Sequence, residues 1–170
     1  MRKKILFLAG MMACGSLAGA QEISKTWVAD KGNGTYQNPV LHADYSDPDV
    51  CAAGDDFYMT ASSFNCIPGI PILHSNDLVN WSLVNYALPV QEPEPFFDKA
   101  QHGKGVWAPA IRFHNGEFYI YWGDPDYGIY MIKTKDPKGK WSKPVLVKAG
   151  KGMIDATPLW DEDGKVYLIH

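Results

Sequence analysis

The chain has 170 residues, of which 46% are hydrophobic and 21% are charged, a balance typical of one globular domain and not of a disordered chain. Its net charge of −3 gives no reason to expect nucleic acid or an anionic membrane as a partner. Aromatic residues make up 13% of the chain, which suits both the packing of β-sheets and the stacking of sugars.

The N-terminus has the pattern of a signal peptide at residues 1–20. Three basic residues precede an apolar run at 5–17, which is too short to span a membrane comfortably, and Ala-Gly-Ala at 18–20 is a typical cleavage site. Cys14 is an alternative processing site, at which a lipid anchor would be attached. Either route predicts an exported protein, periplasmic or extracellular, and we expect no membrane span.

Residues 44–49, Asp-Tyr-Ser-Asp-Pro-Asp, place carboxylates where the first strand of the mature protein should begin. Asp47 precedes a proline and should be extended, so its carboxylate would point out of the end of a sheet. The plainer interpretation is a strand-entry turn, since Asp and Pro are ordinary turn residues. Asp155 favours a functional interpretation, because the repeats described below place it at a position equivalent to that of Asp47.

Cys51 and Cys66 are the cysteines that remain after the signal peptide. An exported protein can pair its cysteines, but two of them without further spacing cues are a weak disulfide signal. We expect both to be free and buried.

Three segments, 55–60, 115–120 and 163–168, repeat a tight turn followed by a strand of alternating aromatic and aliphatic residues. This pattern is the signature of a β-hairpin, and another strand precedes each turn. Tyr58 and Tyr119 hold the same place in their repeats and are 61 positions apart. A period near 60 residues with several strands and no helical pattern predicts the blades of a β-propeller.

Asp77 and Asp136 each lie in a Ser/Thr-x-Asp turn that a tryptophan follows. The side chain of such an Asp can accept backbone N–H groups of its turn while the tryptophan covers it. We therefore interpret both aspartates as structural.

The repeats predict one blade at about 47–88, a second at about 107–147 and the beginning of a third at 155–170. Propellers close with about four blades or more. We therefore expect residues 36–170 to form a partial all-β propeller of about two and a half blades, after a lead-in at 21–35, within a longer protein.

Five short motifs follow one another along the chain, at residues 38–40 with 46–49, 61–64 with 68–72, 75–81, 105–109 and 154–160. In their order and spacing they resemble those of family 43 glycoside hydrolases. The resemblance covers Tyr36 to His170 and implies a five-bladed β-propeller, as in β-xylosidases, α-L-arabinofuranosidases and arabinanases. It implies inverting hydrolysis of pentose-containing plant polysaccharides or oligosaccharides.

The resemblance also implies roles for both carboxylates. An inverting glycosidase needs a base that activates water and an acid that protonates the leaving oxygen. Asp47 matches the general base, and Asp155 matches the residue that raises the pKa of the acid and orients it. The acid is a Glu of the fourth blade, which this chain does not include. No cofactor is required; a central ion often bound in the family takes a histidine from the fifth blade, also outside this chain.

Phe64 and Trp107 match aromatic residues of the family that contact the sugar, although core packing is an equally good explanation for Phe64. Cys66 and Ile67 stand where several members carry bulkier aromatics, which leaves the preference for xyloside or arabinoside open. We expect His102 to be a solvated loop residue. The acidic groups at 124–126 and 161–163 are interpreted as solvated turns, and no metal site is predicted.

Two other functions fit parts of the sequence. A non-catalytic carbohydrate-binding propeller needs the aromatic residues but no acid. A sialidase-like propeller is suggested by the turn at 134–141, but that class holds its carboxylate substrate with a cluster of arginines. Apart from Arg2 in the signal peptide, the sequence contains only Arg112. This argues strongly against a sialidase.

Overall fold

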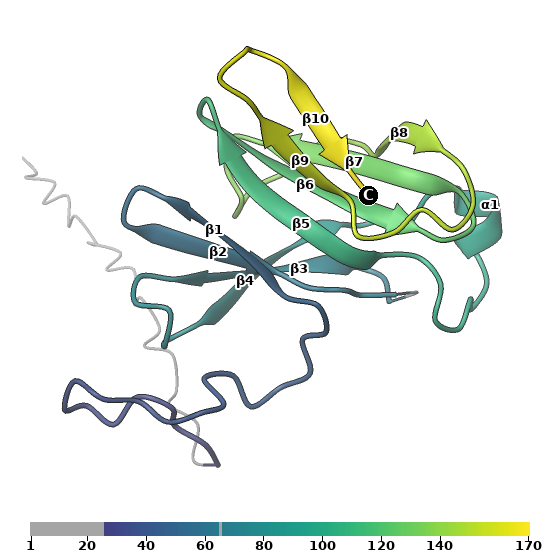
Figure 1. Cartoon of the computed structure of the whole chain (residues 1–170). Helices are drawn as coiled ribbons and strands as arrows, with labels where there is room; N and C mark the ends of the chain where they lie inside the picture. The colour runs from purple at the N-terminus through teal and green to yellow at the C-terminus, as the bar shows by residue number, and fades with distance from the viewer. Residues whose placement is uncertain (1–25, 65) are drawn as a thin grey trace, which may run out of the picture.

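The computed structural model describes residues 26–64 and 66–170. The predicted signal peptide and Cys14 lie outside these residues. The described chain folds into three antiparallel sheets, as predicted from the repeats (Figure 1). In those residues, no helix is long and apolar enough to cross a bilayer.

The first sheet has four strands in sequence order, so each strand pairs with the one before it. Tight turns favour this arrangement: Gly54, for example, has a φ of 64°, which a residue with a side chain rarely adopts. The alternation of side chains gives Tyr58 and Cys51 the same face, because they are direct partners across the first pair of strands. The strands are β1 Asp49–Ala53, β2 Asp56–Thr60, β3 Gly69–Ser75 and β4 Ser82–Leu88.

The second sheet repeats this order, and a two-stranded hairpin follows it. The predicted blade boundaries agree with these sheets to within a few residues. A short helix, α1 Glu94–Phe97, lies in the connection between the first two sheets. The sequence analysis did not anticipate it, because its four residues include a proline and are too few for a helical period. The strands are β5 Trp107–His114, β6 Glu117–Asp124, β7 Gly128–Thr134, β8 Val145–Ala149, β9 Thr157–Trp160 and β10 Val166–Ile169.

The second sheet lies between the first sheet and the β9–β10 hairpin (Figure 1). The ring of Tyr58 packs edge-on against Phe118, with 5.1 Å between centroids. On the other side, Trp160 of β9 stacks on His114 of β5 at 4.7 Å. Trp122 is fully buried within the core. Burying each such large apolar side chain stabilises the fold by about 1.5–3 kcal/mol, so the sheets are held together by their facing side chains.

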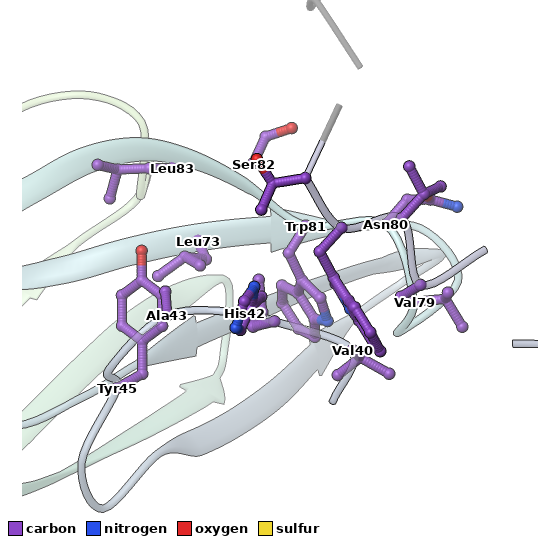
Figure 2. Close-up of a pocket in the computed structure, with 15 residues that line it drawn as sticks. Val40, His42, Ala43, Tyr45, Leu73, Val79, Asn80, Trp81, Ser82 and Leu83 are labelled. Carbon is purple, nitrogen blue, oxygen red and sulfur yellow. The ribbon is translucent and has the colours of Figure 1, made fainter. Parts of the chain in front are cut away.

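Residues 26–29 and 40–45 lie beside the first sheet and line a cavity of about 560 Å³ together with it (Figure 2). Trp27 and Trp81 line this cavity, but the indole N–H of each is already used by a backbone carbonyl. Trp27 donates to Pro39 O at 2.8 Å, and Trp81 donates to Leu78 O at 3.0 Å. This cavity contains none of the site residues predicted from the sequence.

The Ser/Thr-x-Asp turns are structural, as predicted. Asp77 Oδ1 accepts the backbone N–H groups of Val79 and Asn80 at 2.9 and 2.7 Å. Hydrogen bonds from the side chain and backbone of Asn80 lower the pKa of Asp77 to about 2. Asp136 likewise accepts the N–H of Lys138 at 2.9 Å.

The prediction for the cysteines is half right. Both are free, and Cys51 is buried in β1, where burial raises the pKa of its thiol to about 12. Cys66, however, is exposed, because it lies in the irregular connection between β2 and β3 and not in a strand.

Candidate active site

The first strands of the three sheets, β1, β5 and β9, lie side by side and begin in the same way. At the start of each, one residue adopts a left-handed conformation: Asp47 with φ 48°, Ala108 with φ 35° and Asp155 with φ 56°. Such a backbone is uncommon for residues other than glycine and costs on the order of 1–3 kcal/mol each. Its recurrence at equivalent positions of three sheets marks a shared structural feature. The expectation that Asp47 is extended was therefore wrong.

These strand starts line a cavity of about 240 Å³ between the three sheets. Asp47 and Asp155 both line it, so the structure brings together the two carboxylates that the sequence repeats place at equivalent positions. Both residues are exposed to solvent. This cavity is lined by carboxylates, whereas the larger one beside the lead-in is not.

Two hydroxyl groups hold the carboxylate of Asp47. Ser46 and Ser62 each donate an O–H to its Oδ2 at 2.8 Å. Ser62 Oγ in turn accepts the backbone N–H of Ala108 at 2.8 Å, which connects Asp47 to the start of β5. The sequence analysis had not identified Ser62 as a site residue. The motif that contains it gave the signal, but its contact with Asp47 spans 15 positions.

Asp155 is positioned by the chain that precedes it. A Cβ atom on Gly123 of β6 would lie 2.7 Å from Ile154 Cα and 2.7 Å from Met153 O, so only glycine allows this close approach. The N–H groups of Gly150 and Gly152 also donate to carbonyl groups of the β6–β7 turn, at 3.0 and 2.9 Å. The second sheet therefore supports the segment that carries Asp155.

Arg112 joins all three sheets at this cavity. Its Nη1 donates to Asp49 Oδ2 of β1, and its Nη2 donates to Thr157 Oγ1 of β9 at 2.9 Å. Asp49 Oδ2 also accepts the backbone N–H of Ile111 at 2.8 Å.

Phe64 and Trp107 lie beside the cavity and do not line it. Their rings meet edge to face at 6.4 Å, and both are half-buried. Phe64 and Val106 exchange two backbone hydrogen bonds, of 3.1 and 3.3 Å, which attach the connection after β2 to the start of β5. Phe64 lies two residues after Ser62, which donates to Asp47, and Trp107 precedes Ala108, whose backbone N–H donates to Ser62 Oγ.

Residues 36–170 match the family model for glycosyl hydrolases family 43. The chain belongs to this family. Solved family 43 structures have the same fold: the BlXynB protein of Bacillus licheniformis superimposes with a TM-score of 0.69 at 33% identity, over 79% of this chain and 28% of that one. The three sheets are therefore blades of a family 43 β-propeller.

Similar curated family 43 proteins include a putative beta-xylosidase of Xylanibacter ruminicola, 41% identical over 85% of this chain and 27% of that protein. A non-reducing end alpha-L-arabinofuranosidase of Bacteroides ovatus is 37% identical over 79% of this chain and 26% of that protein. The chain thus spans about a quarter of the length of these family 43 relatives.

The acidic turn at 124–126 differs from its prediction. Asp124 is buried, not solvated, and its Oδ1 accepts the N–H groups of Asp126 and Tyr127 at 2.9 and 3.2 Å. Burial raises the pKa of Asp124. Asp126 pairs with Lys104 at 2.9 Å. The turn is fixed in place because the segment before Asp155 packs against it.

The predictions for His102 and for the turn at 161–163 fit the structure. His102 is exposed in its loop, and so is the turn at 161–163. In the described part of the chain, no group of three or more His, Cys, Asp or Glu side chains is arranged to hold a metal ion. These residues therefore do not by themselves form the central ion site that the family resemblance implies, and no chemical step is assigned to an ion.

Proposed function

We propose that this chain forms part of an inverting glycoside hydrolase that cleaves β-xylosides or α-L-arabinofuranosides in pentose-containing plant polysaccharides or oligosaccharides. The observation that carries the proposal is the pairing of Asp47 and Asp155, which come from different blades and line one cavity. The names of the family 43 relatives support a pentoside as substrate. We also propose that the protein is exported, as its N-terminal pattern indicates.

In this mechanism, Asp47 acts as the general base. Its Oδ2 already accepts two hydroxyl groups, which leaves Oδ1 to take a proton from a water molecule. The oxygen of that water forms a bond to the anomeric carbon as the bond to the leaving oxygen breaks. A carboxylic acid supplied from outside this chain gives its proton to the leaving oxygen, and the proton from water stays on Asp47.

Asp155 acts on that acid and not on the sugar. A negative charge near a carboxylic acid disfavours ionisation of the acid and keeps it protonated at neutral pH. Asp155 reaches the cavity from the third blade. We propose that this chain alone is inactive, because without the acid the leaving group departs unprotonated and the rate falls by about 10²–10⁴-fold.

A non-catalytic carbohydrate-binding function is the alternative. The edge-to-face pair of Phe64 and Trp107 favours it, since half-buried aromatic rings beside a cavity can stack on sugars.

The test uses the complete protein, encoded by the full reading frame that contains this chain. Hydrolysis of aryl β-D-xylopyranoside and aryl α-L-arabinofuranoside is measured for the wild type, Asp47→Asn and Asp55→Asn. Asp55 is an exposed turn carboxylate outside the cavity and serves as the matched control. We expect activity in the wild type and the control, and loss of turnover with retained sugar binding in Asp47→Asn. Sugar binding without turnover in the wild type would support the alternative.

A further inference from the structure

We infer that Arg112 is a positioning residue, which sets the separation of Asp47 and Asp155 by bridging the blades that carry them. This inference rests on the proposed function. It assigns to Arg112 a role in catalysis without contact to the reacting atoms.

The bridge lies close to each carboxylate along the chain. Asp49, which accepts from Arg112 Nη1, is the first residue of β1 and lies two residues beyond Asp47. Thr157, which accepts from Nη2, is the first residue of β9 and lies two residues beyond Asp155. Two residues of chain span at most about 7 Å, so a shift of Asp49 or Thr157 is passed on to the neighbouring carboxylate.

Side chains, and not a backbone ladder, connect the first strands of the blades. Strands β1, β5 and β9 belong to three separate sheets and share no ladder of backbone hydrogen bonds. In the described residues, the polar contacts between β1 and β9 run through Arg112, which alone bonds to side chains of both strands. One guanidinium group therefore makes the direct polar link between these two strands, in addition to the contacts that each of them has with the second sheet.

Arginine suits this task better than lysine. Its planar group presents two N–H donors at a fixed angle, so one side chain can hold two acceptors in a set geometry. Lysine offers a single point charge on a flexible chain. Arg112 Nη1 also donates to the backbone carbonyl of the preceding residue, Ile111, at 2.7 Å, and this bond fixes the plane of the guanidinium.

Charge supports the same interpretation. The cavity holds the carboxylates of Asp47, Asp49 and Asp155, and Arg112 is its cationic residue. The guanidinium of Arg112 forms its ion pair with Asp49, the carboxylate that the proposed chemistry does not use. Arg112 therefore bonds to neither Asp47 nor Asp155 itself.

Three roles for Arg112 predict different kinetics. A positioning residue changes kcat and leaves KM nearly unchanged, because the misplaced carboxylates act only in the transition state. A substrate contact raises KM with kcat retained. A purely structural brace lowers the melting temperature and leaves the kinetics of the folded enzyme unchanged.

The experiment compares Arg112→Lys, Thr157→Val and the double variant in the complete protein, with kcat, KM and melting temperature as readouts. Lys133→Met is the matched control, because it breaks an ion pair of 3.0 Å with Glu117 on the same sheet but outside the cavity. Since a displacement of about 1 Å can cost about 10²-fold, we expect kcat to fall by roughly 10–100-fold in Arg112→Lys and by about 10-fold in Thr157→Val. KM should stay within about threefold in both, because binding is not the affected step.

The double variant should be no slower than Arg112→Lys alone, since both substitutions break one bridge. Wild-type kcat in both single variants, beside an inactive Asp47→Asn, would overturn the inference and leave the proposed function standing. A rise in KM alone would also overturn it, in favour of a substrate contact. An inactive wild type would overturn the proposed function and this inference together.

Discussion

Gly123→Ala should reduce catalysis as well as stability. The new Cβ would lie 2.7 Å from two backbone atoms of the segment that leads to Asp155, Ile154 Cα and Met153 O. Ordinary contacts at such a position are 3.4–4 Å, and backbone atoms cannot move aside by a rotamer change. The segment must therefore withdraw by on the order of 1 Å, at a cost of about 1–3 kcal/mol in folding free energy. A displacement of that size at Asp155 corresponds to about a 10²-fold loss of kcat.

Kinetics on an aryl β-xyloside and urea unfolding of the complete protein test this expectation together. Gly54→Ala is the control: its Cβ would meet nothing within 4 Å, but its φ of 64° strains an alanine by about 1–2 kcal/mol. The control should lose stability and keep kcat. If Gly123→Ala also keeps kcat at a similar loss of stability, the segment before Asp155 does not position that carboxylate, and our reasoning is wrong.

Three further outcomes follow from individual contacts. Ser62→Ala removes one donor to Asp47 and the acceptor of the Ala108 N–H. One lost hydrogen bond to a charged group is worth about 1.5–3 kcal/mol, so we expect kcat of the complete protein to fall by roughly 10–100-fold, and an unchanged kcat would contradict this. The pKa of Asp77 is lowered to about 2, so its stabilising effect should be present above about pH 4 and disappear as pH falls toward 2. In unfolding experiments, Asp77→Asn should be less stable than the wild type at pH 7, by at most about 1 kcal/mol because Asp77 is exposed. Equal stability of the variant and the wild type both at pH 7 and near pH 2 would refute the argument. Residues 21–170 expressed alone should hydrolyse neither aryl pentoside, and a monodisperse active monomer would contradict the need for an acid from outside this chain.

Local patterns were sufficient to predict most of the fold. The hairpin repeats at 55–60 and 115–120 contain their own turns and alternating strands, so neighbouring strands could be paired and grouped into blades. The same repeats predicted that Asp47 and Asp155 are equivalent, because both precede the first strand of a blade. The structure confirms their proximity, and their chemical roles remain predictions.

What the sequence did not reveal depends on contacts between distant residues. Arg112 reaches Asp49 across 63 positions and Thr157 across 45, and no local pattern encodes such partners. The turn at 124–126 has the composition of a solvated turn, yet packing against the segment before Asp155 buries Asp124. The left-handed backbone of Asp47 was missed because a residue before proline generally prefers an extended backbone. In the structure, the hydroxyl groups of two serines bind the Asp47 carboxylate while its backbone is left-handed.

The stereochemistry of the reaction tests the central claim most directly. Proton NMR of the complete protein acting on an aryl β-D-xylopyranoside, recorded before mutarotation, identifies the first anomer of xylose that is released. If Asp47 activates water for direct displacement, the first product is α-xylose, and Asp47→Asn releases none. Release of β-xylose as the first product would show a retaining mechanism and contradict the role assigned to Asp47.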